Sequence, residues 1–388
     1  MKKGNFHMII YSELLEYGGG RETWFSYFLP NIIKVNLFDN IFVYYLKPRI
    51  DSDSLARIPF ISNYTKVEFI PINIGIPEKN SVIKNFLVFS IFAFNEIRKR
   101  IKKNDLILLV GSGMEATIGF LLKSIYRNKI KLFTWVRSIT IGELKTRKSS
   151  IYTFSAMLLE NIVLKLSDKI IANGYDTYNY YKKKLIKTSE KIVIIENAVE
   201  YEKFSRLNLP NFSDRPIKIA YIGRINDAKG FNLFIESIKK FKIKYGCLYK
   251  DIEFHVWGGY NKKYEALDNL VIFHRHYKKE DIYDILSSLH VVVFLNRTGL
   301  SGGISHALLE AMAAGRLIIA WDNYIHSQII NNNNGILVPD ENLEMLTDTY
   351  YKILLLDENI FLDKCINARE KAKEFSIENH INKFLSLV

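Results

Sequence analysis

The sequence predicts an α/β fold built from two doubly wound domains. Short apolar segments rich in β-branched residues alternate with longer segments of helical periodicity along the whole chain, a pattern typical of parallel sheets with crossover helices. The first half has expected strands at 7–11, 41–46, 67–71, 106–110, 131–136, 169–172 and 191–195, and the second half at 217–221, 253–257, 270–273, 291–295, 317–320 and 335–338. Each half therefore supplies its own sheet.

A polar connector separates the two halves. Residues 201–216 read YEKFSRLNLPNFSDRP, with two prolines, and the alternation restarts immediately afterwards with IKIAYIG. Because few contacts cross such linkers, we place the boundary there, with one Rossmann-like domain at 1–205 and a second at 206–370.

Length and composition exclude several classes of protein. The chain has 388 residues, of which 48% are hydrophobic and 24% charged, so two domains can each bury a core. Cys247 and Cys365 lie far apart without a CxxC pair, which favours neither a disulfide framework nor a zinc site. The N-terminus lacks the apolar region of a signal peptide, and no apolar run reaches the ~20 residues that span a bilayer. We expect a cytoplasmic protein.

Net charge is concentrated in the first half. Residues 1–205 hold 31 Lys and Arg against 19 Asp and Glu, or +12, whereas residues 206–388 hold 23 against 22, or +1. Around 86–103, the sequence NFLVFSIFAFNEIRKRIKK joins an apolar surface to five basic residues, which suits a helix lying on an anionic membrane. The alternative is a core helix with a solvated basic end. No helix-turn-helix or RNA-stacking signature accompanies the charge, so we expect no nucleic acid partner.

An anion site followed by a hydroxyl-binding acid is predicted within residues 290–320, HVVVFLNRTGLSGGISHALLEAMAAGRLIIA. An apolar strand there leads through Gly302 and Gly303 into a helix. Backbone N–H groups from Gly303 to Ser305 would point at an anion, and Glu310, about two turns further on, could accept hydrogen bonds from a ribose. The alternative is an ordinary buried strand and helix.

A second anion-binding turn is predicted after the strand at 217–221. The segment IKIAYIGRINDAKGF places Gly223, Arg224, Lys229 and Gly230 between that strand and a helix, so two cations project from the carboxyl edge of the sheet. Such a pair could clamp a diphosphate, whereas in isolation it would also fit a solvated turn.

These segments resemble the donor-binding motifs of retaining glycosyltransferases of the GT-B fold, family 4, also called glycosyl transferases group 1. LLEAMAAG contains the second acid of the family's paired-glutamate motif, and GRINDAKG is similar to its GRLxxxKG motif. IIENAVEYEKF at 194–204 and VPD at 338–340 resemble two further motifs in the family's order. The resemblance implies two Rossmann-like domains facing across a cleft, with a C-terminal helix at 371–388 returning to the first domain.

The resemblance also implies site residues. The expected catalytic residues are Arg224, Lys229 and Glu310, and no metal site is expected. The expected donor-binding residues are Gly19, Gly223, Arg224, Lys229, Tyr277, Gly302, Gly303, Ile304, Ser305 and Glu310.

Three positions depart from the family pattern. Gly302 stands where the first motif acid is usual, so the donor sugar cannot be read from the sequence. Arg137 occupies roughly the place where many members keep a histidine, and Ala198 replaces a usual glycine. His306 either faces the sugar or packs in the core, and both interpretations stay open.

The leading hypothesis is a retaining hexosyl- or hexosaminyl-transferase. It would move a sugar from a nucleotide donor, a UDP-sugar, to a membrane-associated glycan or lipid-linked acceptor in surface polysaccharide synthesis, at the inner face of the membrane. We expect it to need no metal or cofactor, because cations and oriented N–H groups can stabilise the leaving diphosphate. The alternatives are a non-catalytic glycosyltransferase-like subunit that binds a glycan or stabilises a partner enzyme, and a nucleic-acid-binding protein.

Overall fold

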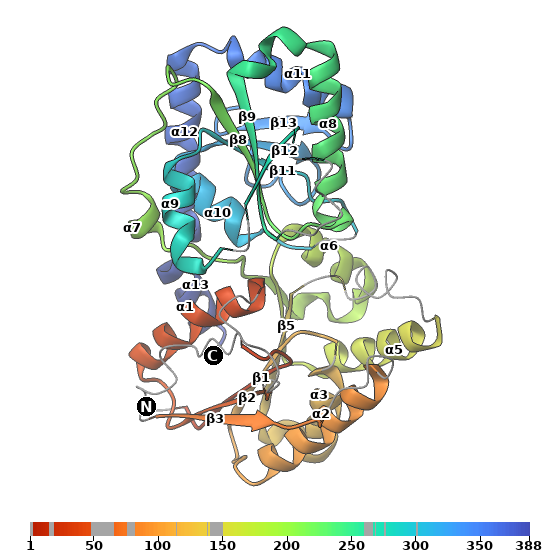
Figure 1. Ribbon diagram of the computed structural model, residues 1–388. Helices are drawn as coiled ribbons and strands as arrows, with labels where there is room; N and C mark the ends of the chain where they lie inside the picture. The colour runs from red at the N-terminus through yellow and green to blue at the C-terminus, as the bar shows by residue number, and fades with distance from the viewer. Residues whose placement is uncertain are drawn as a thin grey trace. The chain divides into compact units, whose positions relative to one another are not determined.

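The computed structural model contains two compact units, each built on a parallel sheet (Figure 1). The structure describes residues 3–14, 19–47, 66–75, 82–113, 115–137, 139, 150–259, 267, 269–274, 277–299 and 302–388, without the side chains of 82–87 and 150–156. The first unit comprises Met1–Glu196 together with Ile381–Val388, and the second comprises Asn197–His380. The chain thus enters the second unit upstream of the boundary that we placed at 205/206, because Asn197 and Ala198 bond to the backbone and side chains of that unit.

The first unit has, in its described part, a seven-stranded sheet in the order β3-β2-β1-β4-β5-β6-β7. Its strands are β1 (Phe6–Ile10), β2 (Ile41–Leu46), β3 (Val67–Ile72), β4 (Leu106–Val110), β5 (Lys131–Val136), β6 (Lys169–Ala172) and β7 (Ile192–Ile194). Its helices are α1 (Gly20–Val35), α2 (Val82–Arg98), α3 (Glu115–Tyr126), α5 (Ser150–Leu166) and α6 (Tyr175–Lys184). β1 and β4 are buried along their whole length, which explains why they read as uninterrupted apolar runs.

Helices cover both faces of this sheet (Figure 1). α2, α3 and α5 pack on one face, where Phe89, Leu122 and Val163 join the core. On the other face, Phe384 of α13 (Ile377–Leu385) lies 5.0 Å from Phe28 of α1, between ring centroids. The carbonyl oxygen of Val388 accepts a hydrogen bond from Lys131 at 3.1 Å. The end of the chain therefore completes the first unit.

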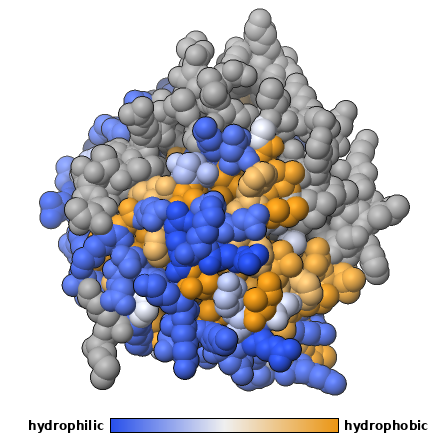
Figure 2. Space-filling view, turned by 90° about the horizontal axis from the view of Figure 1, so that it is seen from below, coloured by the Kyte–Doolittle hydropathy of each residue, from blue (hydrophilic) through white to orange (hydrophobic). Residues whose placement is uncertain are grey.

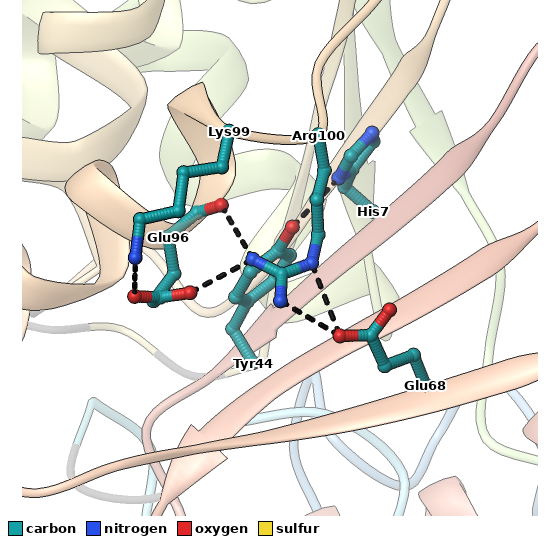
Figure 3. Close-up of polar contacts among 6 residues, drawn as sticks. All are labelled: His7, Tyr44, Glu68, Glu96, Lys99 and Arg100. Carbon is teal, nitrogen blue, oxygen red and sulfur yellow. Dashed lines mark hydrogen bonds and ion pairs between the residues drawn. The ribbon is translucent and has the colours of Figure 1, made fainter.

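Charged side chains fix the end of α2 to the sheet (Figure 3). Arg100 donates from Nε and Nη2 to Glu68 of β3, at 3.1 and 2.7 Å, and from Nη1 to Glu96 of α2 at 2.8 Å. Lys99 pairs with the other oxygen of Glu96. One guanidinium group thus joins the helix end to the edge strand.

Three buried polar side chains, those of His7, Tyr44 and Asp105, form a second hydrogen-bonded group in this sheet. His7 bonds through Nδ1 to the hydroxyl of Tyr44 and through Nε2 to Asp105, each at 3.0 Å. Burial raises the pKa of Tyr44 above its ordinary value, so the phenol is neutral. The Arg100 network thus fixes the end of α2 to the sheet, while the His7 group joins β1, β2 and the residue that precedes β4.

The second unit has, among its described residues, a six-stranded parallel sheet in the order β10-β9-β8-β11-β12-β13. Its strands are β8 (Ile217–Ile222), β9 (Ile252–Trp257), β10 (Ile272–His274), β11 (Val291–Phe294), β12 (Leu317–Asp322) and β13 (Ile336–Pro339). Its helices are α7 (Tyr201–Phe204), α8 (Phe231–Lys244), α9 (Ile282–Ser287), α10 (His306–Ala313), α11 (Leu343–Leu354), α12 (Glu358–Ala372) and the start of α13. The two predicted parallel sheets are confirmed.

The centre of the second sheet determines where its loops meet. β8 and β11 are neighbours with Tyr221 opposite Val293, so the turn after β8 and the segment after β11 leave the same edge side by side. In Figure 1, α8 and α11 cover one face of this sheet, while α9 and α10 cover the other. The predicted anion-binding segments therefore share one edge.

Candidate functional site

Glycines set the path of the turn after β8. Gly230 has φ +72°, and a Cβ atom on it would lie 2.2 Å from the carbonyl oxygen of Leu295. A Cβ atom on Gly258, after β9, would lie 1.7 Å from the carbonyl oxygen of Gly223. Backbones of neighbouring loops are in contact at both places, which only glycine permits.

Arg224 and Lys229 stand on this turn. Arg224 is exposed, and its carbonyl accepts a hydrogen bond from the Tyr221 hydroxyl at 2.6 Å. Lys229 ends a short 3-10 helix, and its backbone N–H donates to the side chain of Asn226 at 3.0 Å. Burial lowers the pKa of His326 to about 3, and the positive charge of Lys229 adds to this effect. The ammonium group therefore lies near the segment that follows β12.

Arg297, which sequence reasoning missed, holds the turn in place. It follows β11 and donates to Asp227 and Glu341, both at 2.6 Å, while its backbone N–H donates to the carbonyl of Ala228 at 3.1 Å. The only signal in the sequence was a single basic residue just after an apolar strand.

The segment before α10 forms the second part of the site. Gly303 has φ +73°, and Ser305 caps α10 by accepting a hydrogen bond from the N–H of Leu308 at 3.2 Å. Asn197 donates to the carbonyl of Ile304 at 2.6 Å. His306 is buried and bonds through Nδ1 to the carbonyl of Ala198 at 3.2 Å. The motif at 194–204 thus supports the start of α10.

Glu310 is a buried carboxyl group in α10. Burial raises its pKa to about 7, against the opposing effect of the Lys279 and Lys203 charges. Burial and the nearby Glu310 also raise the pKa of Tyr277, while Lys279 pairs with Glu200 at 3.6 Å. Glu310 and Tyr277, both predicted as site residues, therefore lie close together beside two cations.

An aromatic surface at the ends of β9 and β10 was also missed. The rings of Trp257 and His274 stack with centroids 3.6 Å apart and an interplanar angle of 1°. His255 bonds to His274 at 3.0 Å between ring nitrogens, and burial, aided by the His255 charge, lowers the pKa of His274 to about 4. Tyr277 meets Trp257 edge-on, so this neutral surface adjoins the Glu310 carboxyl group.

In the first unit, Gly19 and Arg137 lie together at the carboxyl edge of the sheet. Gly19 is the N-cap of α1 and offers no side-chain cap. Arg137 follows β5 and donates from Nη2 to the carbonyl of Gly20 at 3.2 Å. Its guanidinium lies 5.2 Å from the centroid of the Trp24 ring.

The predicted residues of the second unit fall into two groups. Gly223, Arg224 and Lys229 lie on the turn after β8, and residues 302–305 lie beside them after β11. Tyr277 and Glu310 form the other group. Such an edge, with cations, a helix start and a buried acid, can bind a diphosphate and a hydroxyl-bearing sugar.

Sequence similarities to known proteins include this part of the chain. Residues 216–355 match the family glycosyl transferases group 1. The chain is 23% identical over 379 residues to an uncharacterized glycosyltransferase of Methanocaldococcus jannaschii, covering 91% of this chain and 93% of that protein. It is 27% identical over 169 residues to the amylovoran biosynthesis glycosyltransferase AmsK of Erwinia amylovora, covering 41% and 40% of the two chains.

The fold is also found among solved structures. Anabaena HepE, in complex with UDP and glucose, matches with a TM-score of 0.69 and 13% sequence identity, over 100% of this chain and 99% of that one. The protein is a glycosyltransferase of the GT-B fold. Its residues 216–355 form a glycosyl transferases group 1 domain. Both sequence predictions are confirmed, whereas the family 4 assignment and a retaining reaction stay predictions.

Proposed function

We propose that the protein transfers a sugar, with retention, from a UDP-sugar to a membrane-associated glycan or lipid-linked acceptor in surface polysaccharide synthesis. The observation that carries this proposal is the shared edge after β8 and β11, where Arg224, Lys229 and the start of α10 can surround one diphosphate. HepE was crystallised with UDP and glucose, and AmsK acts in amylovoran biosynthesis, which supports this donor and this pathway class.

The chemistry follows from charge. The bond between the sugar's anomeric carbon and the diphosphate oxygen breaks, and the positive side chains of Arg224 and Lys229 stabilise the negative charge on UDP. The acceptor hydroxyl forms the new bond on the same side, and its proton goes to the leaving phosphate. Glu310, as a carboxylate, would accept hydrogen bonds from the ribose hydroxyls. We propose no metal and no cofactor for this reaction.

The proposed donor site also has a place for the base. Trp257 and His274 present flat, neutral rings at the ends of β9 and β10, next to Tyr277. Because His274 is uncharged near neutral pH, the surface carries no charge that would disfavour an uncharged uracil ring.

The membrane part of the proposal rests on α2 and α3. Ile91 and Phe92 of α2 and Ile125 of α3 are each more than half exposed, at 55, 52 and 57%. The basic residues Arg98 and Lys102 follow on the same stretch of chain, and Figure 2 shows hydrophobic areas next to hydrophilic ones on the face of the first unit seen from below. Among the helices described, none has the length and apolar character needed to cross a bilayer. This surface suits peripheral contact with anionic lipid.

Three experiments test the proposal. Calorimetry with UDP should show binding, and a panel of nucleotide sugars screened for released UDP should identify the donor; no binding of any nucleoside diphosphate would end the enzyme proposal. Sedimentation with phosphatidylglycerol-containing vesicles should carry down the protein. Replacing Ile91 and Phe92 by serine should abolish sedimentation, whereas Ile243→Ser, at an 86% exposed position of α8, should not.

A further inference from the structure

Two arginine side chains meet at the start of α1 in the first unit. Arg137 donates to the carbonyl of Gly20 at 3.2 Å, and Arg21 is the next residue along the helix. Arg21 donates from Nη1 to the carbonyl of Tyr11 at 3.1 Å and to the buried carboxylate of Glu115 at 3.2 Å. Burial is the main cause of a lowered pKa of Arg137, to about 10, and the Arg21 charge adds to it. The two guanidinium groups thus repel each other.

Arg137 lacks a bonded counter-charge among the residues that the structure describes. Its Nη1 atom is buried and donates no hydrogen bond. The carboxylate of Glu115 is bonded to Arg21. The charge of Glu22 acts on Arg137 without a bond between them, and the Glu22 carboxylate accepts a hydrogen bond from the hydroxyl of Ser12. A buried charged donor left without an acceptor is destabilising, so an anionic ligand would relieve a real penalty here.

A purely structural role does not account for this arrangement. Arg316 of the second unit is fully buried, and burial lowers its pKa to about 10 as well, but its guanidinium donates to the carbonyls of Ala314, Leu289 and Asn208. Arg137 donates to one carbonyl, its guanidinium lies 5.2 Å from the centroid of the Trp24 ring, and Arg21 and Glu22 act on it by charge without a bond. The side chain is therefore held in place without being neutralised.

We propose that Arg137 and Arg21 bind a phosphate group of the acceptor at the carboxyl edge of the first sheet. This inference rests on the proposed function and names the chemistry of its acceptor. Guanidinium forks bind phosphate oxygens in pairs, and α1 starts at Gly19 without a side-chain cap, which adds the favourable end of a helix dipole. The second unit has its own cations for the donor diphosphate, so this pair serves the other substrate.

Calorimetry with inorganic pyrophosphate tests the pair. The protein is first saturated with UDP, which occupies the donor site, and pyrophosphate is then added. The wild-type protein should bind it, Arg137→Gln should bind it at least tenfold more weakly, and Arg137→Lys should fall between them. Arg127→Gln, at an exposed position of the same unit, should bind like the wild type. UDP affinity should be the same in all four proteins.

Thermal unfolding separates binding from folding. Loss of a structural arginine lowers Tm, whereas removal of a cation without a bonded counter-charge leaves Tm unchanged or raises it. We expect the second result for Arg137→Gln. Equal pyrophosphate binding by the wild type and Arg137→Gln would overturn the proposal, and so would weaker UDP binding with pyrophosphate binding retained, which would assign the guanidinium to the donor.

Competition identifies the source of the phosphate. Displacement of pyrophosphate by farnesyl phosphate would indicate a lipid-linked acceptor, displacement by glucose 1-phosphate would indicate a phosphorylated glycan, and displacement by neither would overturn the assignment to an acceptor. Absence of UDP binding would end the proposed function alone, because the comparison of wild type with Arg137→Gln can then be made by adding pyrophosphate without UDP.

Discussion

At the carboxyl edge of the second sheet, side chains from other segments bond the turn after β8 and the start of α10 in place, through Arg297 and Asn197. At the corresponding edge of the first sheet, the buried atoms without partners among the described residues belong to charged groups, Arg137 Nη1 and Glu115 Oε2, whereas those at the second unit's site belong to neutral groups, Asn197 Oδ1 and Trp257 Nε1. A site whose cations are already held in place suits a diphosphate that is common to many donors. Unpartnered charged groups suit a ligand that supplies the missing partners, which is where relatives with different acceptors should differ.

The largest effect should come from Lys229→Ala. We expect kcat/KM for the donor to fall about 100- to 1000-fold, because an ammonium group that stabilises the leaving diphosphate is lost. Lys240→Ala, at an exposed position of α8, should leave kcat/KM unchanged. If, in the same transfer assay, kcat/KM fell only slightly in Lys229→Ala and strongly in Arg137→Gln, the donor diphosphate would be assigned to the edge of the first sheet and not to the edge of the second.

Glu310 predicts a pH dependence of stability. Its pKa is raised from 4.5 to about 7 in the folded state, so the folded protein binds the proton more tightly than the unfolded chain does. The contribution of Glu310 to the free energy of unfolding should therefore fall as the pH rises from about 4.5 to about 7, by about 3 kcal/mol. The lowered pKa values of His274 and His326 act in the opposite direction in both proteins, so urea unfolding across this range should show the fall in the difference between the wild type and Glu310→Gln. Identical pH profiles would mean that the buried acid is not the cause.

Gly230 tests how tightly the turn after β8 packs. Gly230→Ala should lower the free energy of unfolding by about 2–3 kcal/mol, because its φ of +72° disfavours alanine and the new methyl group would meet Leu295. Gly246→Ala is the matched control, since a Cβ atom there has no neighbour within 4 Å. Similar stability of the two variants, by thermal or urea unfolding, would mean that this edge is less closely packed than the comparison requires.

Asn197→Ala should have the smallest effect. Loss of its 2.6 Å bond to the carbonyl of Ile304 should cost about 1–2 kcal/mol and weaken UDP binding by about tenfold, because the start of α10 loses a support. Asn232→Ala, at an exposed position of α8, provides the reference. Unchanged UDP affinity in calorimetry would show that the segment before α10 holds its shape without Asn197.

Much of this architecture was readable from the sequence because strands and their end motifs are local patterns. The apolar run at 291–294 and the glycines at 302–303 predicted a strand and a turn wherever the rest of the chain lay. Arg297 and the Trp257–His274 stack were missed because their partners are brought together by strand order, which no local pattern encodes. The polar composition of 201–216 likewise showed where the chain is a linker, and not that Asn197 already bonds to the second unit.

The position of Phe384 determines when the first unit can finish folding during synthesis. Its ring packs 6.0 Å from Trp135 and 5.0 Å from Phe28, between centroids, and so fills the interior of a unit encoded mainly by the first 196 residues. Nearly the whole chain must leave the ribosome before that interior is complete. The first unit, although it is synthesised first, therefore cannot finish folding until the end of the chain is made. Until then its uncovered aromatic rings are a surface for chaperones or for aggregation.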